Sequence, residues 1–72
     1  MKKLIASNFH PNTTEQDLVD MFEEYGLETV VLKAGKYAVL TFKDEQGAEQ
    51  AIEEKNQRVF WGYWLRLKFA DR

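Results

Sequence analysis

The sequence predicts an α+β sandwich in which a four-stranded antiparallel sheet carries two helices on one face, in the order β-α-β-β-α-β. Two segments repeat apolar residues at helical spacing, and four shorter segments have the β-branched or alternating composition of strands. At 72 residues the chain has room for one hydrophobic core. Residues 1–72 are therefore expected to form a single domain.

The first half of the chain predicts a strand followed by a helix. Residues 3–7 are short and largely apolar, and a polar loop with Pro11 follows them. Thr14 can cap the next helix, with Asp17 in the capping-box position, and Gly26 is expected to end it. The apolar residues at helical spacing are Leu18, Phe22 and Tyr25.

The second half predicts a hairpin, a helix and a last strand. Residues 28–42 form the hairpin, with a β-branched run over residues 28–32 and a tight connection at residues 34–35. Asp44 can cap a second helix, in which Gly47 is a mild weakness. The inward residues of that helix are Ala48, Ala51 and Ile52. Right-handed crossovers place both helices on one face of the sheet and leave the other open, which is the split βαβ, or ferredoxin-like, arrangement.

Residues 63–69 alternate as a half-buried strand does. This alternation predicts that the fourth strand presents three side chains on the open face of the sheet: Trp64, Arg66 and Lys68.

The charges divide the predicted domain into two faces. The formal net charge is −2 and the pI is about 5.3, values that argue against strong nonspecific attraction to phosphate. However, ten of the twelve acids lie in the two helical segments, whereas most Lys and Arg lie on the strands. A basic sheet backed by acidic helices favours an anionic ligand on the open face.

The composition argues against an enzyme, a metal site and a cofactor. There is no cysteine, His10 is the only histidine, and Ser7 is the only serine, so a nucleophile with its base and orienting group is not available. No cluster has metal-ligand spacing, and the four glycines form no phosphate loop, so no small-molecule substrate is expected either. The start of the chain meets a polar pair too soon for a signal peptide or a membrane span. A monomer in the nucleus or cytoplasm, neither secreted nor membrane-bound, is expected.

From Lys3 to about Ala70 the chain resembles the RNA recognition motif family. Residues 4–9 (Leu-Ile-Ala-Ser-Asn-Phe) look like the hexapeptide of its first strand, and residues 35–42 (Gly-Lys-Tyr-Ala-Val-Leu-Thr-Phe) look like the octapeptide of its third. The resemblance implies binding of single-stranded RNA by rings at three positions, occupied here by Ile5, Tyr37 and Val39. Only Tyr37 is aromatic. Two missing rings, each worth about 1–3 kcal/mol, predict weak binding.

The predicted RNA site combines these three positions with nearby aromatic and basic side chains. Lys3 and Arg72 are expected to add positive charge beside them. The residues expected to contact RNA are Tyr37, Trp64, Arg66, Lys68, Lys36, Ile5 and Val39.

Two alternatives stay open at the level of sequence. Arg58-Val59-Phe60 resembles the Arg-x-Phe motif of splicing-factor homology variants of the same fold, which bind linear peptides. There the acidic first helix takes part, and Asp20, Glu23 and Glu24 supply such acids here. The other alternative is an engineered scaffold without a natural ligand, because two functional rings are replaced and the loop between the second and third strands is short.

Overall fold

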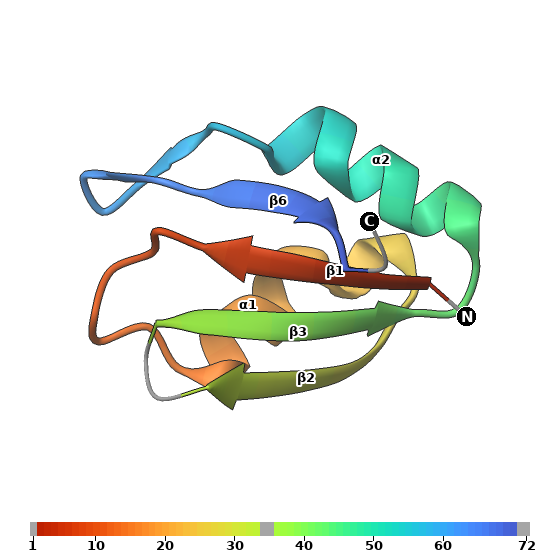
Figure 1. Cartoon of the computed structure of the whole chain (residues 1–72), viewed down its shortest axis with the longest axis horizontal. Coiled ribbons are helices and arrows are strands. Elements are labelled where there is room, and N and C mark those ends of the chain that lie inside the picture. Colours follow the sequence, from red (N-terminus) through yellow and green to blue (C-terminus); the bar gives the residue numbers. More distant parts are fainter. Residues whose placement is uncertain (1, 34–35, 71–72) are drawn as a thin grey trace.

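The computed structural model describes residues 2–33 and 36–70. It confirms the predicted order of elements and adds a small hairpin before the last strand (Figure 1). The elements are β1 (Lys2–Ser7), α1 (Glu15–Phe22), the 3-10 helix η1 (Glu23–Tyr25), β2 (Leu27–Lys33), β3 (Tyr37–Phe42), α2 (Glu45–Lys55), β4 (Val59–Phe60), β5 (Tyr63–Trp64) and β6 (Arg66–Phe69). The predicted connection at residues 34–35, and Arg72, lie outside the described residues.

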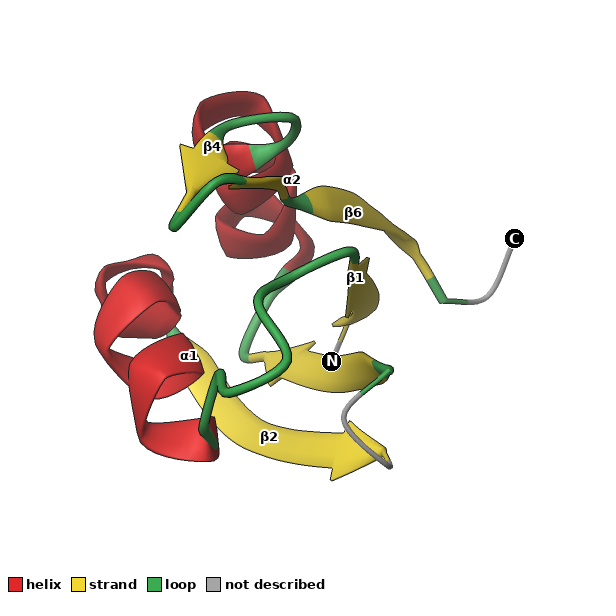
Figure 2. Ribbon diagram, turned by 90° about the vertical axis from the view of Figure 1, so that its left-hand side faces the viewer, coloured by secondary structure: helices red, strands yellow, loops and turns green. Residues whose placement is uncertain are grey.

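Four strands form one antiparallel sheet in the order β2-β3-β1-β6. Both helices lie on the same side of this sheet, and the other side is open (Figure 2). The ferredoxin-like fold expected from the sequence is therefore confirmed.

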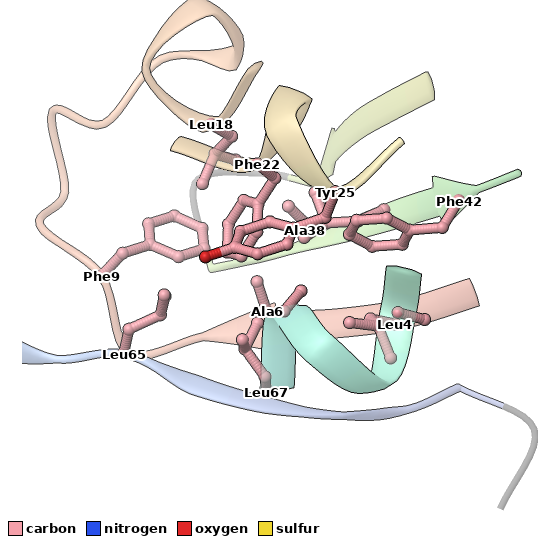
Figure 3. Close-up of a cluster of buried hydrophobic side chains, with 13 residues drawn as sticks. Leu4, Ala6, Phe9, Leu18, Phe22, Tyr25, Ala38, Phe42, Leu65 and Leu67 are labelled. Atoms are coloured by element: carbon pink, nitrogen blue, oxygen red, sulfur yellow. The ribbon is translucent and has the colours of Figure 1, made fainter. Parts of the chain in front are cut away.

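The core lies between the sheet and the helices (Figure 3). Alternate residues of the two central strands, such as Leu4 and Leu40, are fully buried, as period-two side-chain alternation requires. Phe22 of α1 packs edge-on against Phe42 of β3, with ring centroids 6.2 Å apart. Burial of these aliphatic and aromatic side chains is the main favourable contribution to the stability of the domain.

Both helices start where the sequence predicted. The Thr14 hydroxyl accepts the Asp17 N–H (3.2 Å) and the Asp17 carboxylate accepts the Thr14 N–H (3.0 Å), which is the expected capping box. The Asp44 carboxylate accepts the Gly47 N–H at 2.8 Å. The first helix ends earlier than expected, because the chain tightens into η1 after Phe22 before it reaches Gly26.

Gly47, expected to be a mild weakness of the second helix, is required for its packing. A Cβ atom at this position would overlap the backbone carbonyl oxygen of Tyr25. The first turn of α2 therefore approaches η1 more closely than any side chain would allow.

The fourth strand is interrupted at Leu65, so the predicted continuous strand over residues 63–69 is wrong. The Leu65 N–H donates to the Arg58 carbonyl (2.9 Å) and the Gln57 N–H donates to the Leu65 carbonyl (2.6 Å), so Leu65 pairs with the segment before β4. Trp64 itself pairs with Val59 in the two-stranded β4–β5 sheet. Only β6 joins β1, and β4 lies on the helix side of the main sheet (Figure 2). Trp64 is 61% exposed and belongs to β5, and its carbonyl accepts a hydrogen bond from the Asn8 side-chain amide at 2.7 Å, next to the end of β1.

Candidate nucleic-acid interface

The pairing of the strands arranges the open face as a grid of side chains. Directly opposite residues of an antiparallel pair point to the same face, and neighbouring strands lie about 4.8 Å apart. One row runs across Lys33, Tyr37, Ser7 and Arg66, the next across Val31, Val39, Ile5 and Lys68, and the third across Thr29, Thr41 and Lys3. We call these residues the open-face grid.

Every charged residue of the open-face grid is basic. Lys33 and Arg66 stand at the two ends of the first row, Lys68 ends the second row, and Lys3 lies in the third. All four side chains are exposed. The charge segregation expected from the sequence is thus present on the side of the sheet that no helix covers.

Tyr37 occupies an inner place of the first row. Its side chain is 40% exposed and stands between Lys33 of β2 and Ser7 of β1. A phenol ring in this position offers one face on which an unpaired base can stack. Lys36 precedes it in the turn, where its N–H donates to the Lys33 carbonyl at 2.9 Å.

The middle row is aliphatic where stacking rings were expected from the family. Ile5 and Val39 are direct cross-strand partners and half-buried, and Val31 beside them is 44% exposed. These side chains offer van der Waals contact to a base but no π face. The weakened platform predicted from the sequence is therefore retained in the geometry.

A hollow of about 290 Å³ continues the first two rows beyond the β6 edge. It is lined by Ser7, Asn56, Gln57, Arg66, Leu67 and Lys68. The Asn56 side-chain oxygen accepts the Leu67 N–H at 2.9 Å, which fixes the end of α2 against β6. Two basic side chains thus border a recess wide enough to receive part of a nucleotide.

The structure brings together most of the predicted RNA residues and adds one. Tyr37, Ile5, Val39, Arg66 and Lys68 share the grid, Lys36 flanks it, and Trp64 lies in the preceding strand β5. Sequence reasoning missed Lys33, because the predicted second strand stopped one residue before it. The alternation of Thr29, Val31 and Lys33 contained the signal.

The alternative peptide residues are only partly assembled. Arg58 and Phe60 line an open hollow of about 600 Å³ with Glu54, Lys55 and Val59. The amine of Lys55 lies 5.9 Å from the centroid of the Phe60 ring, which explains a basic residue on this part of α2. The predicted acids Asp20, Glu23 and Glu24 do not line this hollow.

Glu24 is instead engaged at Tyr25. The Tyr25 hydroxyl donates to the Glu54 carboxylate at 2.7 Å. Burial of the phenol, followed by its hydrogen bonds to Glu54 and Glu24, raises the pKa of Tyr25 far above its ordinary value. The hydrogen bond between Tyr25 and Glu54 therefore joins η1 to α2, while Glu24 lies beside Tyr25 within η1.

Metal and membrane features are missing from the part of the chain that the structure describes. No group of three His, Cys, Asp or Glu side chains there could hold a metal ion. None of the helices over residues 2–33 and 36–70 has the length and apolar character needed to span a membrane.

Known proteins share both the sequence pattern and the fold. A family model of the RNA recognition motif matches residues 4–66. The chain is 36% identical over 67 residues to serine/arginine-rich splicing factor RS31A of Arabidopsis thaliana, an alignment that covers 92% of this chain and 26% of the relative. The chain therefore spans about a quarter of that protein's length.

Solved structures agree with this assignment. The Nab3-RRM, in a structure that concerns cis element recognition of non-polyadenylated RNAs, has a TM-score of 0.86 at 25% identity and covers 99% of this chain and 96% of its own. The NONO-1 homodimer of C. elegans has a TM-score of 0.87 at 26% identity over 94% of this chain and 28% of its own. The matched family model, the sheet order and the open face together show that the chain belongs to the RNA recognition motif family.

Proposed function

We propose that this chain is an RNA-binding module that holds single-stranded RNA on the open-face grid. The observation that carries the proposal is that all four charged residues of the grid are basic, in a chain whose net charge is −2. Membership in the RNA recognition motif family and the RNA named for the Nab3 neighbour support it.

Each part of the grid has a distinct role in this proposal. Tyr37 stacks one unpaired base, while Ile5 and Val39 pack against a second base without stacking it. Lys33 and Arg66 are placed to neutralise the phosphates on either side of Tyr37. Lys3, Lys36 and Lys68 extend the basic border. One ring in place of three makes the complex weak and its sequence preference shallow.

The proposed setting follows from the relatives. Because the matched relatives are splicing factors, we expect the chain to act in the nucleus. We further expect it to act as a monomeric binding module without catalytic activity.

The experiment is a backbone amide NMR titration with a degenerate pool of single-stranded RNA at low salt. Saturable shifts should cluster at Ile5, Tyr37, Val39 and Arg66. Tyr37→Ala and Arg66→Ala should each weaken binding, whereas Lys43→Ala should not, because Lys43 is an exposed base outside the grid. The absence of shifts at millimolar RNA would refute the proposal and leave a peptide ligand or a scaffold without a ligand.

Peptide binding at the Phe60 hollow is a second candidate. Its supporting observation is that Arg58, Phe60 and Glu54 border one recess, which suits an aromatic residue next to a basic one. A peptide with one tryptophan flanked by arginines should then shift the Phe60 and Glu54 amides, and Arg58→Ala should weaken that binding. Shifts confined to the open-face grid would exclude this candidate.

A further inference from the structure

A second recess lies away from the RNA site, between the loop after β1 and the tip of the β4–β5 hairpin. It has a volume of about 290 Å³ and is lined by His10, Asn12, Thr13, Asp17 and Trp61. None of these residues belongs to the open-face grid or to the Phe60 hollow. Its size is at the lower limit of ligand sites, which run from about 300 to 1,000 Å³, so it suits a single side chain.

Trp61 forms one wall of the recess and is not used by the core. Its side chain is 61% exposed, and its backbone has a φ of 53°, in the left-handed region. Gly62 follows with a φ of 83°, so the two residues make the kind of hairpin turn that favours Asn, Asp or Gly at both places. A bulky exposed ring at a strained backbone position is the kind of outlier that accompanies a functional site.

Thr13 supplies the second observation. It is 6% exposed, and its hydroxyl oxygen is the one buried side-chain polar atom without a hydrogen-bond partner among residues 2–33 and 36–70. Buried hydroxyls are normally paired, so Thr13 is exceptional among the residues that line the recess.

The charge of the recess selects the ligand. Asp17 is the only carboxylate in the lining, and its carboxylate uses one of its acceptor sites for the Thr14 N–H. The Nδ1 atom of His10 accepts the Asn12 N–H at 3.0 Å, which holds the ring against its own loop. A recess lined by one carboxylate and by no Lys or Arg attracts a positive group and repels a phosphate.

We propose that this recess binds an arginine side chain of a partner peptide. A guanidinium group is planar and can stack on the Trp61 ring while it donates to the Asp17 carboxylate. Its five N–H donors also suffice for the side-chain oxygen of Asn12. Lysine has a point charge and three donors, so it matches the wall and the acceptors less well.

The experiment uses the full chain and a synthetic peptide, acetyl-Gly-Ser-Arg-Ser-Gly-amide, followed by NMR on the two indole N–H groups. The peptide should shift the Trp61 indole saturably and leave that of Trp64 unchanged. Trp64 is a matched control because both side chains are 61% exposed. A peptide with neutral citrulline in place of arginine should not bind, and one with lysine should bind more weakly.

Two variants test the site without endangering the fold. Asp17→Asn keeps an acceptor for the Thr14 N–H but removes the charge, and should weaken binding roughly fivefold or more. Trp61→Asn suits the left-handed turn and should weaken binding roughly two- to fivefold, the range of a cation–π contact at an exposed site. Trp64→Asn should leave the affinity unchanged.

Several results would overturn the proposal. Equal binding of the citrulline peptide would show that charge is not recognised. Unchanged affinity in both Asp17→Asn and Trp61→Asn would place the peptide elsewhere. Shifts of the Trp61 indole by single-stranded RNA but not by the arginine peptide would make the recess a base pocket. None of these results bears on whether RNA binds the open-face grid.

Discussion

The salt dependence of RNA binding gives the sharpest test of the open-face grid. For single-stranded RNA each neutralised phosphate contributes about −0.7 to the slope of log K against log salt. The grid contains four basic side chains, so a slope of about −2.8 is predicted if each of them neutralises one phosphate. Between 50 and 200 mM salt the affinity should then fall about 50-fold.

Removal of one basic side chain from the grid should reduce the slope of log K against log salt by about 0.7. Lys68→Gln should reduce the slope to about −2.1, so that the loss over the same range becomes about 18-fold. Lys43→Gln, which removes an exposed base outside the grid, should leave it at the parent value.

The assay is fluorescence anisotropy with a labelled oligonucleotide at a series of potassium chloride concentrations. A slope close to zero would mean that phosphate contacts contribute little. Equal reductions by Lys68→Gln and Lys43→Gln would mean that only net charge matters, and either result would refute the assignment of phosphates to the grid.

Three further predictions concern single residues. Tyr37→Ala should weaken RNA binding by about 1–3 kcal/mol, whereas Tyr37→Phe should keep most of the affinity. If fluorescence anisotropy gives equal losses of affinity for the two variants, stacking is not the cause. Gly47→Ala should lower the free energy of unfolding by about 1–3 kcal/mol in urea denaturation, although alanine favours helices, because its Cβ would overlap the Tyr25 carbonyl. The raised pKa of Tyr25 means that the folded state holds this proton more tightly than the unfolded state, so the resulting stability is present below the ordinary value of 10.0 and is lost at higher pH. Between about pH 9 and pH 11 the free energy of unfolding of Tyr25→Phe should therefore fall less than that of the parent, as measured by urea denaturation. If the two free energies fall equally with pH, the stability does not depend on the Tyr25 proton.

The fold was predictable because its elements carry long periodic signals. The helical spacing of Leu18 and Phe22 points to one buried face of the first helix, and the alternation of residues 63–69 points to one buried face of the last strand. These local preferences all agree with the β-α-β-β-α-β order, and the structure has that order.

The β4–β5 hairpin was not predictable in the same way. Two-residue strands are too short to show a period, and Trp61-Gly62 lacks the Asn-Gly or Asp-Gly composition of a hairpin turn. The burial of residues 64–69 does alternate as expected, but side-chain alternation does not specify the hydrogen-bond partner of Leu65. That choice depends on Arg58 and Gln57, which the chain brings close only after α2 has packed.

Gly47 shows the limit of propensity as a guide. Host measurements rank glycine well below alanine in helices, by about 1 kcal/mol. Here the tertiary approach of η1 leaves no room for a Cβ, and this contact lies outside any window of the sequence that contains only α2. The unpaired Thr13 hydroxyl was hidden for the same reason, because its recess is formed by segments some fifty residues apart.

Net charge is a poor guide to this domain because its two faces are farther apart than charges interact in salt. The shortest extent of the molecule is 21 Å, whereas screening acts over about 10 Å at 0.1 M salt. The acidic helices therefore do not cancel the basic grid under physiological conditions. At 0.01 M salt the screening length reaches about 30 Å, and the acids on the far side should then oppose RNA. The logarithmic salt plot should accordingly be straight above roughly 50 mM and flatten below it. A plot that stays straight to 10 mM would show that the RNA responds to the grid alone.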